Sequence, residues 1–376
     1  MKTNTILQGD SLSKLKELPD KSINMCLTSP PYWALRDYGT AHWKGGDDKC
    51  NHSTEHTSPK STLGGGKTTQ NVASFYKDFC KRCGAKRIDK QLGLEKTFDE
   101  YINNLCDIFD EVKRVLRDDG SCWVNVGDTY YGSGSGTQYE PSIENSKEVY
   151  VAPYSSMKIK QRNKDAPYKA KSLCLIPQRF TIEMVNRGWI LRNTIIWYKG
   201  NCMPSSVKDR FSVDFEYMFF FSKKKKYYFE QQFEPYSQET INDGRFNPGS
   251  SDNHIYNWKA DGQDDNLSIK IQRGGFKQGS IEGRNKRAVW KINPKGFKEA
   301  HFAVYPEKLC ETPIKAGCPK GGIVLDPFFG SGTTGVVTLK QSKKFIGIEL
   351  NPKYIEIANK RLKPHLEQTK LTNIIK

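Results

Sequence analysis

Residues 323–335 read IVLDPFFGSGTTG, and this stretch decides the fold. Its first letters, IVLD, are typical of a short buried strand in a parallel sheet. Three glycines follow the strand, Gly330, Gly332 and Gly335, and we expect a helix to begin among them, near Thr333. Glycines let the chain turn tightly and let its backbone approach a ligand. The next apolar stretch, KFIGIEL (344–350), carries Glu349 about 20 residues on, where such folds place a carboxylate that binds ribose hydroxyls.

The residue before the loop indicates which ligand it holds. Asp326 lies directly ahead of the turn, and a carboxylate there suits a cation better than a pyrophosphate. S-adenosylmethionine carries a sulfonium and an ammonium group but no phosphate, so we expect Asp326 to face that end and Glu349 to hold the ribose. By spacing alone, a nicotinamide dinucleotide site or a tight turn without any ligand would give the same pattern. We find no constellation for hydride transfer.

Strands and helices alternate outward from this loop. A helix containing KYIEIANKRL (353–362) follows the strand that carries Glu349, and TILQG (5–9) and INMCLT (23–28) are predicted strands near the start. Such alternation implies an α/β fold with a doubly wound, mostly parallel sheet of the Rossmann type.

The middle of the chain adds two helices and three more strands. Thr97 is a predicted N-cap with Glu100 as the other half of a capping box, and the helix is expected to run to Asp119-Gly120. The next predicted elements are the strand SCWVNVGD (121–128), the helix PQRFTIEMVNRG (177–188), and the strands WILRNTIIWYK (189–199) and FEYMFFF (215–221).

The strand INMCLT runs into Ser29-Pro30-Pro31-Tyr32, and this turn is suited to chemistry on an amino group. Two prolines cannot donate ladder hydrogen bonds, so the chain turns with its carbonyls exposed. An exocyclic amine is a poor nucleophile because its lone pair is delocalised into the ring. Ser29 Oγ and the Pro30 carbonyl could accept hydrogen bonds from the N–H groups of the amine and so make its lone pair available for attack. Tyr32 offers an aromatic face on which a base flipped out of a duplex could stack. The alternative is an ordinary Pro-Pro loop with a core aromatic residue.

Composition favours a soluble protein that binds a polyanion. The 376 residues carry a net charge of +17, which favours nucleic acid as a partner, although a lysine-rich proteome would also produce such a charge. No apolar run approaches the roughly 20 residues that span a bilayer, and the N-terminus lacks the apolar stretch of a secretion signal. We therefore expect no membrane association and a cytoplasmic location.

Four residues of the polar insert 41–94 have the spacing of a zinc site: Cys50, His52, Cys80 and Cys83. A Cys-x-x-Cys pair followed by glycine is a common zinc hairpin, and Cys-x-His supplies two further tetrahedral ligands. A metal would explain how a long insert of low apolar content stays ordered. Unliganded thiols or redox chemistry are the alternatives, and His42 or His56 could replace His52. Other cysteines, such as Cys26 and Cys122, lie in apolar patterns typical of a core.

The motifs TSPPYW (28–33) and DPFFGSGTTG (326–335) together resemble those of amino-methylating DNA methyltransferases, in the order of the circularly permuted beta class. The resemblance spans roughly residues 1–40, 95–222 and 300–362. It implies the catalytic motif Ser29, Pro30, Pro31 and Tyr32. The cofactor contacts that it implies, together with those inferred above, are Asp10, Asp326, Phe328, Gly330, Ser331, Gly332, Thr333 and Glu349. LRNTIIWYK resembles a strand lining the target-base pocket, and HFAVYPEKL (301–309) a segment that packs on the methionine moiety.

The same resemblance frames the choice of base. The chain has no Pro-Cys pair of the kind that methylation at cytosine C5 normally needs. Relatives with serine before Pro-Pro-Tyr are mostly cytosine-N4 enzymes and those with aspartate mostly adenine-N6 enzymes, so Ser29 favours cytosine N4, with adenine N6 as the alternative. RNA or protein acceptors, or a DNA-binding module without activity, remain further alternatives.

The predicted organisation gives each region a role. Residues 1–40, 95–222 and 300–376 form the methyltransferase core, 41–94 the insert, 130–172 a mobile loop, and 223–299 the target-recognition region. Basic residues of the recognition region are expected to contact double-stranded DNA: Arg284, Lys286 and Arg287. In the loop, Lys158, Lys160, Arg162 and Lys164 would face DNA as it closes. The protein would be prokaryotic or phage-encoded and nucleoid-associated, act as a monomer or homodimer, and have a cognate restriction endonuclease as a candidate partner.

Overall fold

The structure is a computed structural model. It describes residues 1–34, 40–54, 74–75, 79–131, 168–202, 204–205, 207–242, 283–294 and 304–374. The chain divides into two units, one formed by residues 1–229 with 289–376 and the other by residues 230–288. The predicted DNA-facing residues Lys158, Lys160, Arg162 and Lys164, and the alternative ligand His56, lie outside the described residues.

An eight-stranded sheet forms the centre of the first unit. Its strands lie in the order β1 (Thr5–Gln8), β14 (Lys344–Glu349), β13 (Ile323–Asp326), β2 (Ile23–Thr28), β7 (Leu116–Val126), β9 (Phe215–Ser222), β8 (Ile190–Tyr198) and β12 (Val289–Lys291). The first five strands are parallel. β9 runs antiparallel to both β7 and β8, while β12 is parallel to β8. The predicted doubly wound, mostly parallel sheet is confirmed.

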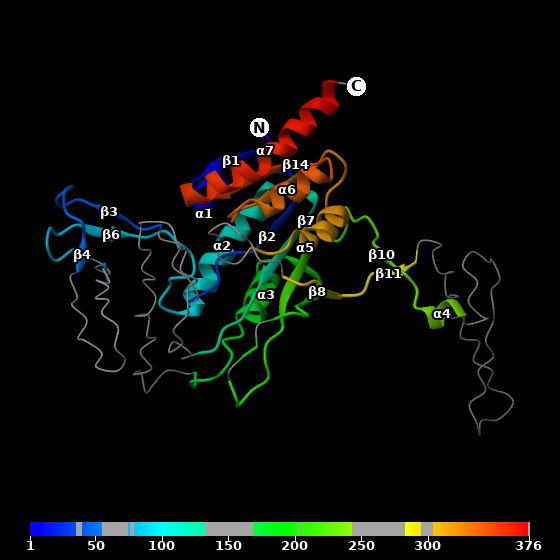
Figure 1. Cartoon of the computed structure of the whole chain (residues 1–376), viewed down its shortest axis with the longest axis horizontal. Coiled ribbons are helices and arrows are strands. Elements are labelled where there is room, and N and C mark those ends of the chain that lie inside the picture. The colour runs from blue at the N-terminus through cyan, green and yellow to red at the C-terminus, as the bar shows by residue number, and fades with distance from the viewer. Residues whose placement is uncertain are drawn as a thin grey trace, which may run out of the picture. The chain divides into compact units, whose positions relative to one another are not determined.

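Helices cover both faces of this sheet (Figure 1). Three of them pack in a row: α1 (Ser11–Lys16), α2 (Phe98–Val115) and α3 (Ile176–Asn186). A second row consists of α5 (Glu307–Gly317), α6 (Thr333–Lys340) and α7 (Pro352–Ile374). Successive side chains of β7 point to opposite faces of the sheet and pack on different rows. Cys122 and Val124 belong to the same core cluster as α2. Trp123 packs on the other face against α5, where a Cβ on Gly317 would lie 2.8 Å from Trp123 Nε1. Burial on both faces explains why these strands read as nearly continuous apolar runs.

Helix α2 begins as predicted and ends early. Thr97 is its N-cap, and the Thr97 hydroxyl accepts a hydrogen bond from the Glu100 amide at 3.1 Å. The predicted end at Asp119-Gly120 is wrong, because the helix stops at Val115 and β7 begins at Leu116. Leu116 fits the helical spacing, but it is fully buried and pairs with Ile23 of β2 across a β-bulge. Strand pairing thus overrides the helical pattern at this point.

The insert contains two short antiparallel ribbons. One pairs β3 (His42–Lys44) with β6 (Lys86–Ile88), and the other pairs β4 (Ser53–Thr54) with β5 (Ser74–Phe75). The second unit contains α4 (Gln238–Asn242) and a ribbon of β10 (Phe233–Glu234) with β11 (Arg284–Asn285). Among the described residues, no helix combines the length and the apolar character needed to cross a membrane.

Candidate active site

The two sequence motifs lie at the ends of neighbouring parallel strands. β2 pairs with β13 through Val324 beside Met25 and Leu325 beside Cys26, so both strands end at the same edge of the sheet. The Thr28 hydroxyl donates to the Asp326 carboxylate at 2.6 Å and joins these strand ends directly. The chain winds away from this point in both directions, through α6 to β14 and through α2 to β7. Such a switch point is where open α/β sheets bind ligands.

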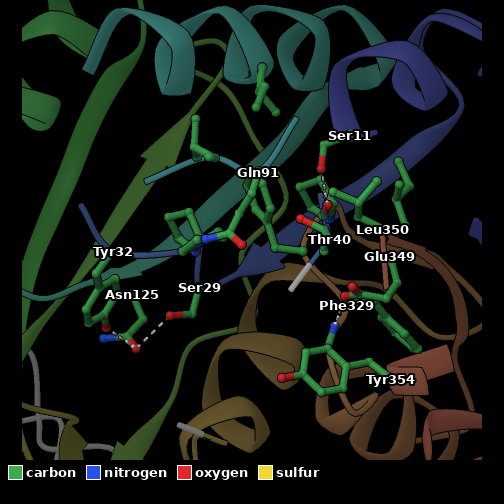
Figure 2. A pocket seen from close by; sticks show the side chains of 18 of the residues that line it. Ser11, Ser29, Tyr32, Thr40, Gln91, Asn125, Phe329, Glu349, Leu350 and Tyr354 are labelled. Atoms are coloured by element: carbon green, nitrogen blue, oxygen red, sulfur yellow. Dashed lines mark hydrogen bonds between the residues drawn. The ribbon is translucent and has the colours of Figure 1, made fainter. Parts of the chain in front are cut away.

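A cavity of about 740 Å³ opens at this switch point (Figure 2). Its lining includes ten of the predicted site residues: Asp10, Ser29, Pro30, Pro31, Tyr32, Phe328, Gly330, Ser331, Thr333 and Glu349. Figure 2 shows Ser29 and Tyr32 at one end of the cavity and Glu349 at the other. The predicted meeting of the two distant segments in one cleft is confirmed, and the cavity has the size of a small-molecule site.

At the Ser29 end, the cavity is lined by two residues that carry acceptor oxygens, Ser29 and Pro30. Ser29 Oγ donates a hydrogen bond to Asn125 Oδ1 at 3.3 Å, which leaves the lone pairs of this hydroxyl to accept others. The Pro31 carbonyl accepts from the Tyr101 hydroxyl at 2.8 Å. Among the described residues, by contrast, none donates to the Pro30 carbonyl. Ser29 and Pro30 therefore offer the two oxygen acceptors that an amino group would need.

Three residues that the sequence interpretation did not single out surround Tyr32. The Tyr32 hydroxyl donates to Glu216 Oε2 at 2.7 Å, and Asn125 Nδ2 donates to the same oxygen at 3.1 Å. Lys199 forms an ion pair with Glu216. Burial, and then the Glu216 charge, raise the pKa of Tyr32 well above its usual value, so the phenol stays neutral. Each of these polar residues interrupts or ends an apolar strand at the pocket edge, and this was the available sequence signal.

Gly127 fixes the position of the Tyr32 ring, and this leads to a prediction. A Cβ at residue 127 would lie 2.6 Å from Tyr32 Cε2. We expect Gly127→Ala to displace the ring and lower kcat roughly tenfold or more, because a misplacement of about 1 Å can cost up to a hundredfold. The measurement is steady-state methylation kinetics together with thermal unfolding. Gly321→Ala, at the far end of β13, is the control for stability alone: a Cβ there meets no atom, but its φ of 71° strains the backbone, so it should lower thermal stability and leave kcat unchanged. Unchanged kcat in Gly127→Ala would contradict this role.

The glycine loop forms the other end of the cavity. The Glu349 carboxylate accepts from the Gly330 amide at 2.7 Å and from the Asn351 amide at 2.8 Å, which ties the loop to the end of β14. Burial raises the pKa of Glu349. Gly332 is the N-cap of α6, and its positive φ of 82° favours glycine. Gly332 itself does not belong to the cavity lining but lets the loop turn into the helix.

Asp326 is placed differently from the prediction. It is 1% exposed and does not belong to the cavity lining, and burial raises its pKa. Its carboxylate accepts hydrogen bonds from Thr28, Thr334, Tyr305 and the Phe328 amide. Asp326 thus holds the loop from behind, and the structure places it outside the cavity lining, whereas the sequence predicted that it would face a ligand there. A carboxylate at the end of a strand can point either toward a ligand or inward, where it accepts hydrogen bonds from its own loop. The sequence does not distinguish these two orientations.

The charges around the cavity fit a cationic ligand. Six carboxylate side chains line it: Asp10, Asp89, Glu95, Asp107, Glu216 and Glu349. The basic side chains among the described lining residues are Lys90 and Lys199, and Lys199 is already paired with Glu216. An excess of acids disfavours a pyrophosphate and suits the sulfonium and ammonium groups of S-adenosylmethionine. The residues present therefore fit this cofactor better than a dinucleotide.

The four predicted metal ligands in the insert lie together. The ligand atoms of Cys50, His52, Cys80 and Cys83 are all within 4.8 Å of one another. The backbone amides of Asp47 and Ala85 donate to the Cys83 sulfur and lower the pKa of this thiol to about 6. All ten cysteines of the chain are free thiols, and Cys26 and Cys122 are buried as predicted.

The predicted DNA-contacting residues lie at the end of the second unit. Arg284 and Arg287 both form ion pairs with Glu234, at 2.9 and 2.6 Å. Arg287 is nevertheless 69% exposed, and Lys286 is exposed beside it. This ribbon presents basic side chains to solvent, and their contact with DNA stays a prediction.

The sequence of the chain is similar to those of known DNA methyltransferases. The family model described as DNA methylase, of the N6/N4 methyltransferases, matches residues 23–360. The Type II methyltransferase M.Cfr9I of Citrobacter freundii is 34% identical over 374 residues, which cover 99% of this chain and 90% of that protein. M.XycI of Xanthomonas campestris pv. cyanopsidis, also a Type II methyltransferase, is 32% identical over 362 residues, 96% of this chain and 88% of that protein.

A solved structure supports the same fold. The cytosine-N4-specific PvuII DNA methyltransferase superposes with a TM-score of 0.52 at 18% identity, over 96% of this chain and 86% of that chain. At this identity the likeness concerns the fold alone. The family match and the close relatives go further: the chain belongs to the DNA methylase family, the methyltransferases that modify the exocyclic amino groups of adenine at N6 or cytosine at N4.

Proposed function

We propose that the chain transfers a methyl group from S-adenosylmethionine to N4 of a cytosine flipped out of double-stranded DNA. The observation that carries this proposal is the single cavity lined by both the Ser29–Tyr32 turn and the glycine loop. A methyl donor and an amino acceptor must meet within bonding reach, and one cavity at a switch point provides that meeting.

The cofactor would occupy the glycine-loop end. When bound, S-adenosylmethionine supplies an electrophilic methyl group whose bond to sulfur breaks as the amine attacks. Glu349 would accept hydrogen bonds from the ribose hydroxyls, Phe328 would cover the apolar surface, and Asp10 would lie at the adenine, as the family resemblance implies. Asp326 would act indirectly by holding Phe328 and the loop in place.

The base would occupy the Ser29 end, where the chain makes the amine reactive. Ser29 Oγ and the Pro30 carbonyl would accept the two N–H groups and draw the nitrogen toward tetrahedral geometry. Its lone pair then forms the new N–C bond as the S–C bond breaks, and one proton passes from the nitrogen to water afterwards. Tyr32 would stack on the base, with its ring fixed by Gly127 and its hydroxyl by Glu216. Catalysis is therefore largely positioning and desolvation.

Cytosine N4 is proposed because of Ser29. Relatives with serine before Pro-Pro-Tyr are mostly cytosine-N4 enzymes, and the fold neighbour named above is described as cytosine-N4-specific. Adenine N6 is the competing product. Both bases would present an amino group to the same two acceptors, so the methylated nucleoside itself must be identified to distinguish them.

A labelled-methyl assay tests the proposal. The purified chain is incubated with tritiated S-adenosylmethionine in three separate reactions, which contain double-stranded DNA, RNA or protein as the acceptor. Labelled DNA is then digested to nucleosides for chromatography. We expect label on DNA that co-elutes with N4-methylcytosine. Label on N6-methyladenine would overturn the choice of base. Transfer only to RNA or protein, or cofactor binding without transfer, would overturn the DNA substrate or the catalytic role.

The sequence specificity would come from the second unit. We propose that residues 230–288 read the target and that Arg284, Lys286 and Arg287 contact DNA. The relatives are named Type II methyltransferases, which supports a role as the modification partner of a restriction endonuclease. Base flipping is part of the same proposal, since an amino group inside a duplex cannot reach a cavity at the sheet edge.

Glu349 gives a prediction for the cofactor. We expect Glu349→Ala to weaken S-adenosylmethionine binding about tenfold or more, because hydrogen bonds to a charged group contribute roughly 1.5–3 kcal/mol. Isothermal titration calorimetry measures this effect without turnover. Glu356→Ala, an exposed position on α7, is the matched control and should bind normally. Equal affinity in the two variants would exclude Glu349 from the cofactor site.

A further inference from the structure

We propose that Cys50, His52, Cys80 and Cys83 bind one structural Zn²⁺ ion, and that this ion holds the insert against the wall of the catalytic cavity. The four ligand atoms lie within 4.8 Å of one another. The sulfurs of Cys50 and Cys80 are 3.8 Å apart, and Cys83 Sγ is 3.4 Å from His52 Nδ1. Two sulfurs on a tetrahedral zinc ion are roughly 3.8 Å apart, because each Zn–S bond is about 2.3 Å long.

The donor set selects zinc over a disulfide. Three thiols and one imidazole match a closed Cys₃His site, which leaves no position open for substrate or water. A disulfide would need two sulfurs about 2.0 Å apart, and it would leave a third thiol and the imidazole beside it without a role.

The backbone around the four residues has the form of a metal-binding turn. The Gly84 amide donates to the Cys80 carbonyl at 2.8 Å, and the Cys80 amide donates to the Ala85 carbonyl at 2.8 Å, so the chain folds tightly around the Cys80–Cys83 pair. Gly84 has a φ of 73°, which favours glycine. A Cβ on Gly46 would lie 2.8 Å from Cys83 Sγ, so the opposing segment packs directly on the sulfur.

The histidine is held in place from outside the cluster. The Trp43 ring stacks on His52 with centroids 4.5 Å apart, which orients the imidazole toward Cys83. Trp43 lies on β3, whose pairing with β6 brings the segment before Cys50 beside the segment after Cys83. A two-stranded ribbon of this size is marginal by itself, so the bound ion would supply the missing stability.

The insert leads directly to the cavity. β6 continues into Asp89, Gln91 and Glu95, which line the cavity. Thr40, on the other side of the insert, donates to Asp89 at 3.1 Å. The segment after β6 forms hydrogen bonds with the residues that follow Tyr32. The Gly93 carbonyl accepts from the Ala34 amide at 2.9 Å, and the Glu95 carbonyl accepts from Trp33 Nε1 at 3.0 Å.

Loss of the ion should therefore disturb the base end of the cavity more than the cofactor end. This second part rests on the proposed function, whereas the presence of zinc does not. The glycine loop is held by Asp326 at the end of β13 and by Glu349 at the end of β14. Neither residue belongs to the insert, so cofactor binding should persist without the metal.

Metal content tests the first part without any assay of activity. We expect elemental analysis of the purified full-length protein to find one zinc per chain, and cobalt substitution to give thiolate-to-cobalt absorption. Cys83→Ser should lose the ion. Cys202→Ser, a half-buried cysteine outside the cluster, should retain it. The proposal is overturned if the wild-type protein expressed with added zinc holds none, or if Cys202→Ser loses zinc equally.

Metal depletion tests the second part and does not depend on a variant that folds. Zinc is removed from the wild-type protein with a chelator and then restored. We expect depletion to raise the KM for DNA and to expose residues 86–95 to hydrogen exchange, with S-adenosylmethionine affinity unchanged and both effects reversed by zinc. Full methylation by the depleted protein would overturn the positioning role while leaving the metal site in place. Lack of methylation in the zinc-loaded protein would instead count against the proposed function.

Discussion

Replacing Ser29 by alanine is expected to lower kcat by about a hundredfold to a thousandfold, the loss seen when one preorganised hydrogen-bond partner of a transition state is removed. Ser29 Oγ is one of the two oxygen acceptors at the base end of the cavity. Its hydrogen bond to the amine strengthens as the nitrogen becomes tetrahedral, so its loss raises the barrier more than it weakens binding. Single-turnover kinetics with labelled cofactor measures this step.

The control for Ser29 is a second half-buried serine, which flanks the opposite end of β2. Ser22 lies before the other end of β2 and bonds the Pro19 carbonyl, far from the cavity. Ser22→Ala should methylate DNA normally, and Ser29→Ala should bind the cofactor as tightly as the wild type. If Ser29→Ala retained a normal kcat, its hydroxyl would have no part in activating the amine.

Replacing Tyr32 by alanine is expected to reduce kcat/KM by up to a hundredfold, because stacking of a base on an aromatic ring contributes about 1–3 kcal/mol. The ring is held by Gly127 and the hydroxyl by Glu216, so the face toward the cavity is already in place before a base arrives. Fluorescence of 2-aminopurine at the target position would report the loss of stacking independently of turnover.

Tyr32→Phe separates the ring from its hydroxyl. Phenylalanine keeps the stacking face and loses only the hydroxyl with its bonds to Glu216 and Asn125, so we expect this variant to keep most of the activity. A loss in Tyr32→Phe as large as that in Tyr32→Ala would show that the hydroxyl, rather than the ring, carries the function.

The sequence predicted the parts of the fold that depend on local pattern. Apolar runs that end in a turn gave β2 and β13, and the glycines after Asp326 gave the start of α6 at Thr333. The adjacency of these strands followed from the general rule for ligands in open α/β sheets. The four ligands of the insert could be named because Cys-x-x-Cys and Cys-x-His each fix a local geometry.

Other features depend on contacts that sequence spacing does not encode. The orientation of Asp326 is decided by donors on three separate segments, Thr28, Tyr305 and Thr334. The Tyr32–Asn125–Glu216 network joins residues of the turn, β7 and β9, and it exists only because β9 inserts antiparallel beside β7. The early end of α2 likewise follows from the pairing of Leu116 with Ile23.

The account rests on a methyl donor and an amino acceptor sharing one cavity at the ends of β2 and β13. A crystal structure of the protein with a non-reactive analogue of S-adenosylmethionine tests this most directly. The account predicts density for the analogue between Gly330 and Glu349, with its sulfur-equivalent atom directed toward Ser29 and Pro30. Density elsewhere on the molecule, or an analogue whose reactive end points away from Ser29, would contradict it.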